Sequence, residues 1–148
     1  MKVIRNQGSV DMEQMLSKPL FAHLATVEEG VPKDSPVWFL WEEEHIWILG
    51  STSADRFPHR LKQNPTCAIG IIDYEKATGK VIHIGFRGEA SVEPFDSERA
   101  NRLLRRYLGP NTDTWDSRFT TFDEQTILVR VKPETVVVRD QSYKVQIT

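Results

Sequence analysis

Seven consecutive residues carry the side chains best suited to bind a charged small molecule. They read Gly50-Ser51-Thr52-Ser53-Ala54-Asp55-Arg56 and join the end of a predicted strand to the start of a predicted helix. Proteins bind phosphate with fixed hydroxyl and backbone donors, the positive end of a helix dipole and a bidentate guanidinium. The segment therefore predicts an anion site in which Ser51, Thr52, Ser53 and Arg56 are the donors.

Basic residues on the following helix add positive potential to this segment; they are His59, Arg60 and Lys62. Taken alone, however, hydroxyl and acidic residues before a helix are more often an ordinary cap of a surface helix whose basic residues are solvated. Both interpretations stay open at this point.

Other kinds of site are not supported by the sequence. It has no phosphate-binding loop of the Gly-x-x-x-x-Gly-Lys-Ser/Thr type, no dinucleotide fingerprint and no Gly-x-Ser-x-Gly nucleophile motif. Histidines stand at 23, 45, 59 and 83 without the spacing of a metal site, so no metal is expected. The single Cys67 is predicted to be a small core residue. Any redox chemistry would therefore have to come from a bound cofactor.

Composition limits the class of protein. The chain has 148 residues, 39% of them hydrophobic, with a net charge of -2, so we expect one globular domain spanning residues 1–148. The charge gives no reason to expect a nucleic-acid partner. No apolar run reaches the roughly 20 residues of a membrane helix, and the first residues lack the apolar stretch of a secretory signal. With one cysteine and no disulfide possible, we expect a cytoplasmic protein.

Hydrophobic patterning predicts a mainly β protein with short helices, of the α+β class. Helices are predicted at residues 11–17, 55–63 and 96–107, and six strands at 20–27, 34–41, 45–49, 68–74, 81–92 and 126–138. Tight turns between most strands favour a closed or nearly closed antiparallel barrel.

Two neighbouring strands are apolar on both faces, around Trp38 and around Trp47. A barrel strand with one wet face should alternate, so something must cover the outer face. A helix of the same chain could do so, but a partner subunit, a flat ligand or both are favoured. The long loop from 109 to 124 raises the further hypothesis that Trp115 reaches a partner's cofactor; the alternative is packing against its own barrel.

Several segments together resemble the pyridoxamine 5'-phosphate oxidase-like superfamily of FMN-binding split barrels. They are Leu24-Ala25-Thr26-Val27, Gly30-Val31-Pro32, Ser35-Pro36-Val37-Trp38-Phe39, Ile46-Trp47-Ile48, Arg56, Leu61-x-x-Asn64-Pro65 and Gly88-x-Ala90-x-Val92, within residues 11–138. The resemblance implies a six-stranded antiparallel split β-barrel that binds FMN at the interface of a homodimer.

The resemblance also implies roles for particular residues. The strand Val37-Trp38-Phe39 would lie against the flavin ring, Ser51, Thr52 and Ser53 would donate to the phosphate, and Arg56 would be the phosphate-binding arginine. His83 falls near a position that offers a polar side chain to the ring. The lysine that usually follows the arginine is replaced by Phe57, so His59 or Arg60 would have to compensate. The C-terminal Trp and Arg pattern of true pyridoxamine phosphate oxidases is also absent.

Three functions follow from this resemblance. The first is a flavin-dependent oxidoreductase acting on a small-molecule substrate. The second is a non-catalytic flavin-binding protein resembling the general stress proteins, and the third is the same fold holding a deazaflavin or a haem.

Overall fold

The computed structural model describes residues 1–8 and 10–146. It is built mainly of strands, as the sequence predicts. The strands are β1 (Lys2–Asn6), β2 (Ala22–Glu28), β3 (Val31–Val37), β4 (Leu40–Glu42), β5 (His45–Ser51), β6 (Thr66–Glu75), β7 (Lys80–Glu93) and β8 (Thr126–Asp140). The helices are α1 (Met12–Leu16), α2 (Phe57–Gln63) and α3 (Ser97–Leu108), followed by two 3-10 turns, η1 (Thr112–Thr114) and η2 (Ser117–Phe119).

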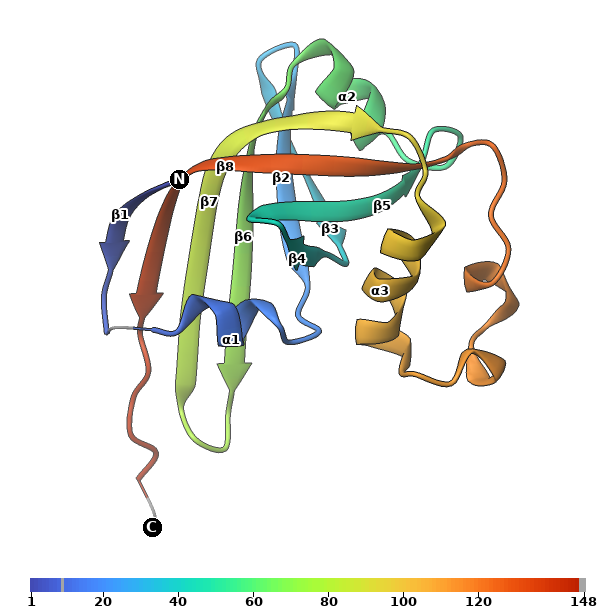
Figure 1. Ribbon diagram of the computed structural model, residues 1–148. Coiled ribbons are helices and arrows are strands. Elements are labelled where there is room, and N and C mark those ends of the chain that lie inside the picture. Colours follow the sequence, from blue (N-terminus) through green and yellow to red (C-terminus); the bar gives the residue numbers. More distant parts are fainter. Residues whose placement is uncertain (9, 147–148) are drawn as a thin grey trace.

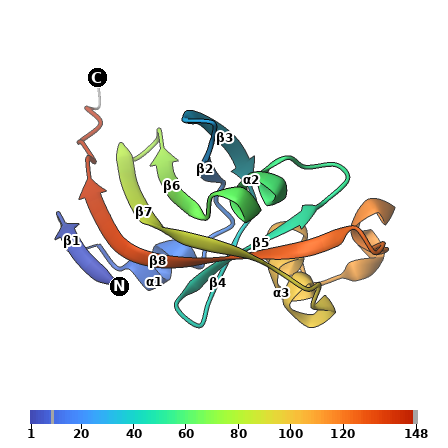
Figure 2. The same ribbon diagram turned by 90° about the horizontal axis from the view of Figure 1, so that it is seen from above.

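The strands form one strongly curved sheet that is not closed. Their order is β3-β2-β6-β7-β8-β5-β4, all pairs being antiparallel, and β1 adds to β8 in parallel. In Figure 1, β7 and β8 bend through both halves of the sheet, and Figure 2 shows the sheet curling beneath α2. Within the described residues the outer strands β3 and β4 do not pair, which gives the split-barrel character predicted from the sequence.

Local signals predicted most element boundaries. Asp11 and Asp96 cap α1 and α3 by accepting backbone N–H groups, and Glu29 and Gly30 make the β2–β3 turn with positive φ angles of 51° and 77°. The second helix begins at Phe57 rather than at the predicted residue 55, because the Asp55 carboxylate instead accepts the Ser51 N–H at 2.8 Å.

The predicted strand from 34 to 41 is wrong, because the structure divides it into β3 and β4. The backbone groups of Phe39 bond to side chains of α3 instead of to a neighbouring strand. Phe39 N–H donates to the Tyr107 hydroxyl at 3.0 Å, and the Arg106 guanidinium donates to the Phe39 carbonyl. Tyr107 also donates to the Leu20 carbonyl at 2.7 Å, and Arg106 donates to the carbonyls of Leu16 and Lys18 at 2.8 and 2.6 Å. The end of α3 therefore joins two other chain segments, residues 16–20 and the β3–β4 break at Phe39.

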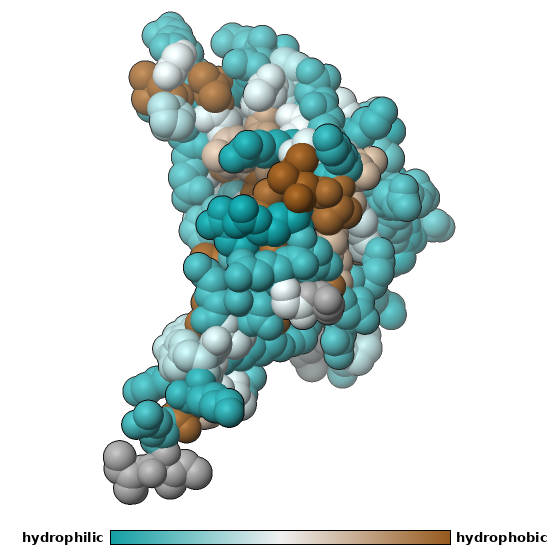
Figure 3. All heavy atoms as spheres, turned by 90° about the vertical axis from the view of Figure 1, so that its left-hand side faces the viewer, coloured by the Kyte–Doolittle hydropathy of each residue, from teal (hydrophilic) through white to brown (hydrophobic). Residues whose placement is uncertain are grey.

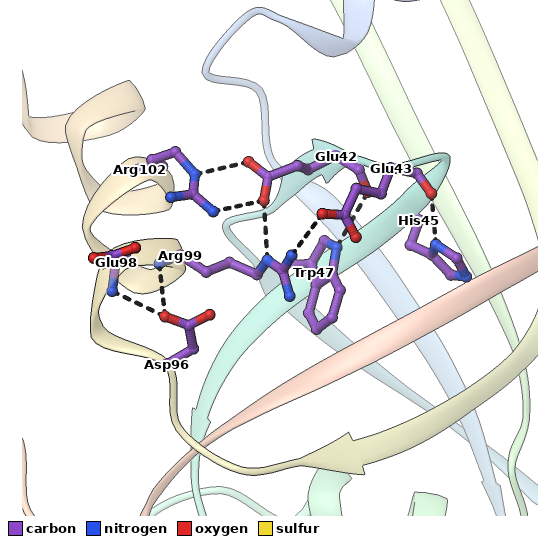
Figure 4. Close-up of polar contacts among 8 residues, drawn as sticks. All are labelled: Glu42, Glu43, His45, Trp47, Asp96, Glu98, Arg99 and Arg102. Atoms are coloured by element: carbon purple, nitrogen blue, oxygen red, sulfur yellow. Dashed lines mark hydrogen bonds and ion pairs between the residues drawn. The ribbon is translucent and has the colours of Figure 1, made fainter.

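The outer face around Trp47 is covered by α3 of the same chain, not by the partner or ligand that the sequence pattern favoured. Trp47 is 5% exposed, and the Arg99 guanidinium lies 3.7 Å from its ring centroid. Figure 4 shows Arg99 and Arg102 reaching from α3 to Glu42, at 3.0 and 2.7 Å. The hydrogen bond from Arg102 is the main cause that lowers the pKa of Glu42. Two arginines of α3 are paired with Glu42 of β4, so this helix can cover the apolar face around Trp47 while its opposite side stays in water.

Cys67 lies in the main core, as predicted. Its neighbours there are large aliphatic and aromatic side chains such as Ile69, Ile71 and Phe86. Burial raises the pKa of the thiol to about 12, so it stays protonated and unreactive at neutral pH.

An ion-pair cluster joins the end of α1 to the β6–β7 hairpin. Asp73 is buried, and its Oδ2 lies 2.8 Å from Lys18 Nζ and 3.1 Å from Lys80 Nζ. Burial alone would raise the pKa of Asp73, but the two lysines outweigh it, so that the pKa lies below its ordinary 3.8.

Asp73→Asn is expected to lower the free energy of unfolding by about 1.5–3 kcal/mol near neutral pH, since charge-assisted hydrogen bonds are lost. A carboxylate whose pKa is lowered by folding stabilises above its unfolded-state pKa, and this contribution disappears as pH falls through the folded-state pKa. Urea unfolding should therefore separate the two proteins near neutral pH and bring them together in acid. The exposed Glu124→Gln is the control, and an equal gap at both pH values would contradict the role of Asp73.

Most of the surface on the side of β1 is hydrophilic. Figure 3 shows separate apolar patches there, and exposed apolar residues of the chain's first segment include Met1, Val3 and Ile4. Across residues 1–8 and 10–146, no helix combines the length and the apolar character needed to cross a membrane.

Candidate functional site

A large groove runs beside the open edge of the sheet, next to the β3–β4 break. Its volume is about 1100 Å³, and three walls line it. The first wall consists of Phe21 and residues 34–38. The second wall consists of residues 54–57 and Arg60. The third wall consists of Leu49 and residues of α3 and η2. Ordinary small-molecule sites are about 300–1,000 Å³, so the groove can hold a cofactor-sized ligand.

Arg60 is the most unusual residue of this groove. It is 8% exposed, and it lines the groove although it carries a positive charge. Its Nε donates to the buried Thr26 hydroxyl at 2.8 Å, and its Nη2 donates to the Ser35 hydroxyl at 3.2 Å. No carboxylate of the described residues lies within 4.0 Å of it. A buried guanidinium without a counter-ion is costly, so the groove favours an anionic ligand at this point.

Phe57 stands where the resemblance leads one to expect lysine. Its ring is buried and forms part of both the core and the groove wall. Gly50 makes room for it, since a methyl group there would come within 2.9 Å of the ring. Arg60, one helical turn after Arg56, is therefore the second cation of the groove, whereas His59 turns away and lies 2.8 Å from the Thr52 carbonyl.

Trp38 lines the groove and stacks with two aromatic rings of its own chain. Tyr107 stacks on it at a centroid distance of 4.5 Å and an interplanar angle of 4°, and Phe119 lies at 5.5 Å and 27°. Val37 also lines the groove, while Phe39 is fully buried behind it. A ligand in the groove can therefore contact Val37 and Trp38, but it cannot contact the buried Phe39 ring directly.

Arg56 lines the groove, whereas the three predicted hydroxyl donors do not. The Arg56 side chain is 73% exposed, and its guanidinium lies 3.9 Å from Glu28. Ser51 Oγ bonds Ser53 Oγ at 3.0 Å and accepts from Ala54 N–H, while Thr52 bonds Gln125 at 2.6 Å. These hydroxyls close the loop before α2, and their role as phosphate donors stays a prediction.

Two further predicted site residues lie away from the groove. His83 lies on the outer face of β7, with its ring over Gly70 and Gly85. Trp115 is 9% exposed and packs in its own chain, donating from Nε1 to the Gly109 carbonyl at 3.0 Å. The hypothesis that Trp115 reaches a partner's cofactor does not fit this placement, since Trp115 already belongs to a hydrophobic cluster with Trp47, Leu103 and Leu104 of its own chain.

Comparison with known proteins gives the chain a family. The family model described as pyridoxamine 5'-phosphate oxidase matches residues 11–139. The chain belongs to this family. The match covers nearly the same residues as the resemblance in the sequence, and it includes every wall of the groove.

Solved structures agree with this assignment to the pyridoxamine 5'-phosphate oxidase family. A conserved hypothetical protein from Mycobacterium tuberculosis is 15% identical with a TM-score of 0.76, and 97% of each chain is covered. General stress protein 26 from Bacillus anthracis is 16% identical with a TM-score of 0.65, covering 92% of this chain and 95% of that one. These two show the shared fold.

An F420 reductase is 25% identical with a TM-score of 0.63, and the alignment covers 84% of this chain and 94% of that one. No curated protein matches the sequence.

Sequence reasoning missed much of the groove of this family member. The sequence named His59 and Arg60 together as replacements for the missing lysine, and only the fold distinguishes them. Arg60, four residues after Arg56, lines the groove with it, whereas His59 bonds the Thr52 carbonyl. The sequence gives no sign that Ser35, the α3 leucines and the η2 residues belong to one site. They share a place around the groove, but they have no regular spacing along the chain.

Proposed function

We propose that this protein binds FMN in the groove and acts as a flavin-dependent oxidoreductase on a small molecule. The observation that supports this most is Arg60, a buried cation held by Thr26 and Ser35 and left without a carboxylate partner among the described residues. A phosphate would supply the missing charge. Arg56 adds a second guanidinium from the same side of the groove.

In this proposal different residues of the groove bind different parts of FMN. Arg56 and Arg60 hold the phosphate, and the backbone from Ser35 to Trp38 contacts the ring system. That backbone belongs to the sheet's outer strand β3 and to the break after it, so it has hydrogen-bonding groups that no neighbouring strand of the described chain uses. Leucines from α3 exclude water from the opposite wall. When bound, FMN supplies the electron-transfer chemistry.

A deazaflavin is the second candidate cofactor. The 25% identity to an F420 reductase favours it, and Phe57 in place of a second neighbouring cation is consistent with a less charged phosphate group. Both ligands combine a flat ring system with an anionic chain, so both agree with the same groove.

We also propose that the cofactor sites lie at the interface of a homodimer. Trp47 gives this no support, because α3 covers that residue. The support for a second subunit comes from the outer sheet face, where Ile72 and Tyr74 of β6 are 54% and 58% exposed. Next to them, the His83 ring lies over Gly70 and Gly85. Sedimentation of the cofactor-saturated protein should give twice the mass of 17.1 kDa.

The visible spectrum of the freshly purified protein, followed by titration with FMN, riboflavin and F420, tests the proposed cofactor. FMN should bind in a one-to-one ratio with each chain and far more tightly than riboflavin, which lacks the phosphate. If F420 binds more tightly than FMN, the deazaflavin replaces FMN as the proposed cofactor. A haem spectrum would contradict both proposals. Turnover of reduced nicotinamide with an electron acceptor would support the oxidoreductase, whereas tight FMN without turnover would leave a binding protein.

A further inference from the structure

The three carboxylates of the groove are all engaged within the fold. Asp34 Oδ2 lies 3.1 Å from His23 Nδ1, Asp55 Oδ2 accepts the Ser51 N–H at 2.8 Å, and Asp116 Oδ1 accepts the Arg118 N–H at 3.0 Å. The acids therefore have fixed positions, and of the three only Asp116 lies within 4.0 Å of a groove arginine, at 3.8 Å from Arg118 Nε.

The arginines lie at two separate places in the groove. Arg56 and Arg60 come from the start of α2, whereas Arg118 comes from η2, in the loop after α3. Figures 1 and 2 both show that α2 (green) and the turns after α3 (orange) lie apart, on different sides of β5. The wall between them is apolar and includes Leu49, Leu104 and Leu108.

The Arg118 guanidinium lies over an aromatic ring at the η2 end of the groove. Its guanidinium lies 5.0 Å from the centroid of the Phe119 ring, and Phe119 in turn stacks on Trp38. An arginine stacked on a ring keeps its in-plane N–H groups available for a planar carboxylate. The Asp116 carboxylate is 3.8 Å from Arg118 Nε, too far for a hydrogen bond, and the side chain is 75% exposed.

We propose that Arg118 recognises the carboxylate of an organic acid whose apolar part lies along the α3 leucines. This subsite rests on the proposed function, because it assigns the α2 end of the groove to the cofactor phosphate and the η2 end to the substrate. The volume of about 1100 Å³ is above the ordinary range for one small molecule, which leaves room for a second ligand.

The test uses 2-naphthoate as the probe and 2-naphthamide as its neutral analogue, titrated into the FMN-saturated protein by calorimetry. Naphthoate should bind more tightly than the amide, and Arg118→Ala should weaken naphthoate about two- to fivefold, since a bidentate contact is lost at a side chain that water screens. Arg118→Lys should restore only part of the affinity. Arg105→Ala, an exposed arginine of α3 outside the groove, should change nothing.

Several outcomes would overturn the subsite. One is equal binding of naphthoate and naphthamide, and another is equal naphthoate binding by wild type and Arg118→Ala. A loss of FMN affinity in Arg118→Ala would assign this arginine to the cofactor instead. If FMN does not bind at all, the proposed function fails, but Arg118-dependent binding of naphthoate to the unliganded protein would still support the subsite.

Discussion

Arg60→Met is expected to weaken FMN binding roughly ten- to hundredfold while changing the free energy of unfolding by less than about 1 kcal/mol. Charged hydrogen bonds contribute about 1.5–3 kcal/mol, and the bound phosphate would lose the only buried cation that lines the described groove. Stability should change little, because removing an unneutralised buried charge offsets the lost hydrogen bonds to Thr26 and Ser35.

Two other variants in or beside α2 serve as controls for the effect of Arg60→Met on FMN binding. Arg56→Met should weaken FMN by a smaller factor, because the Arg56 side chain is 73% exposed and screened by water. Lys62→Met, an exposed residue that does not line the groove, should leave affinity unchanged. Riboflavin should bind wild type and Arg60→Met alike. Unchanged FMN affinity in Arg60→Met, or an equal loss for riboflavin, would place the phosphate elsewhere.

Gly88→Ala is expected to destabilise the fold by about 3 kcal/mol or more, because two paired strands leave no room for a methyl group at this position. Gly88 faces Pro133 where the β7–β8 register shifts, and an added Cβ would overlap the Lys132 carbonyl oxygen and lie 3.1 Å from the Glu134 amide nitrogen. Backbone atoms cannot rotate away as a side chain could, so the bulge itself must open. Guanidinium unfolding of the variant should show a clearly lowered midpoint with an unchanged slope.

Gly85→Ala is the matched control on the same strand. An added methyl group there would meet only the His83 ring, at 3.4 Å, and more distant atoms. Because that ring is the end of a side chain and can shift, we expect a cost below about 1 kcal/mol. Similar losses in both variants would mean that glycine is required for strand conformation in general and not for the close approach at the bulge.

Local chemistry was enough to predict most of the architecture. Capping by Asp11 and Asp96, the glycine turn after β2 and the alternation of β6 to β8 each depend on residues close together in sequence. The junction before α2 also depends on local residues, and Arg56 from it lines the groove, while its role toward a phosphate stays a prediction. Strand β1 was missed because all five of its residues are exposed, so its sequence has no alternation to detect.

Long-range packing determined the rest. The sequence Val37-Trp38-Phe39 predicts a continuous strand. Tyr107 and Arg106, almost 70 positions later, instead hydrogen-bond the backbone groups of Phe39, and the strand ends there. The cover over Trp47 likewise comes from α3, and the charge of Arg60 matters only because folding buries it against Thr26 and Ser35. Propensity and patterning act between sequence neighbours, whereas desolvation and side-chain hydrogen bonds depend on what the curved sheet brings into contact.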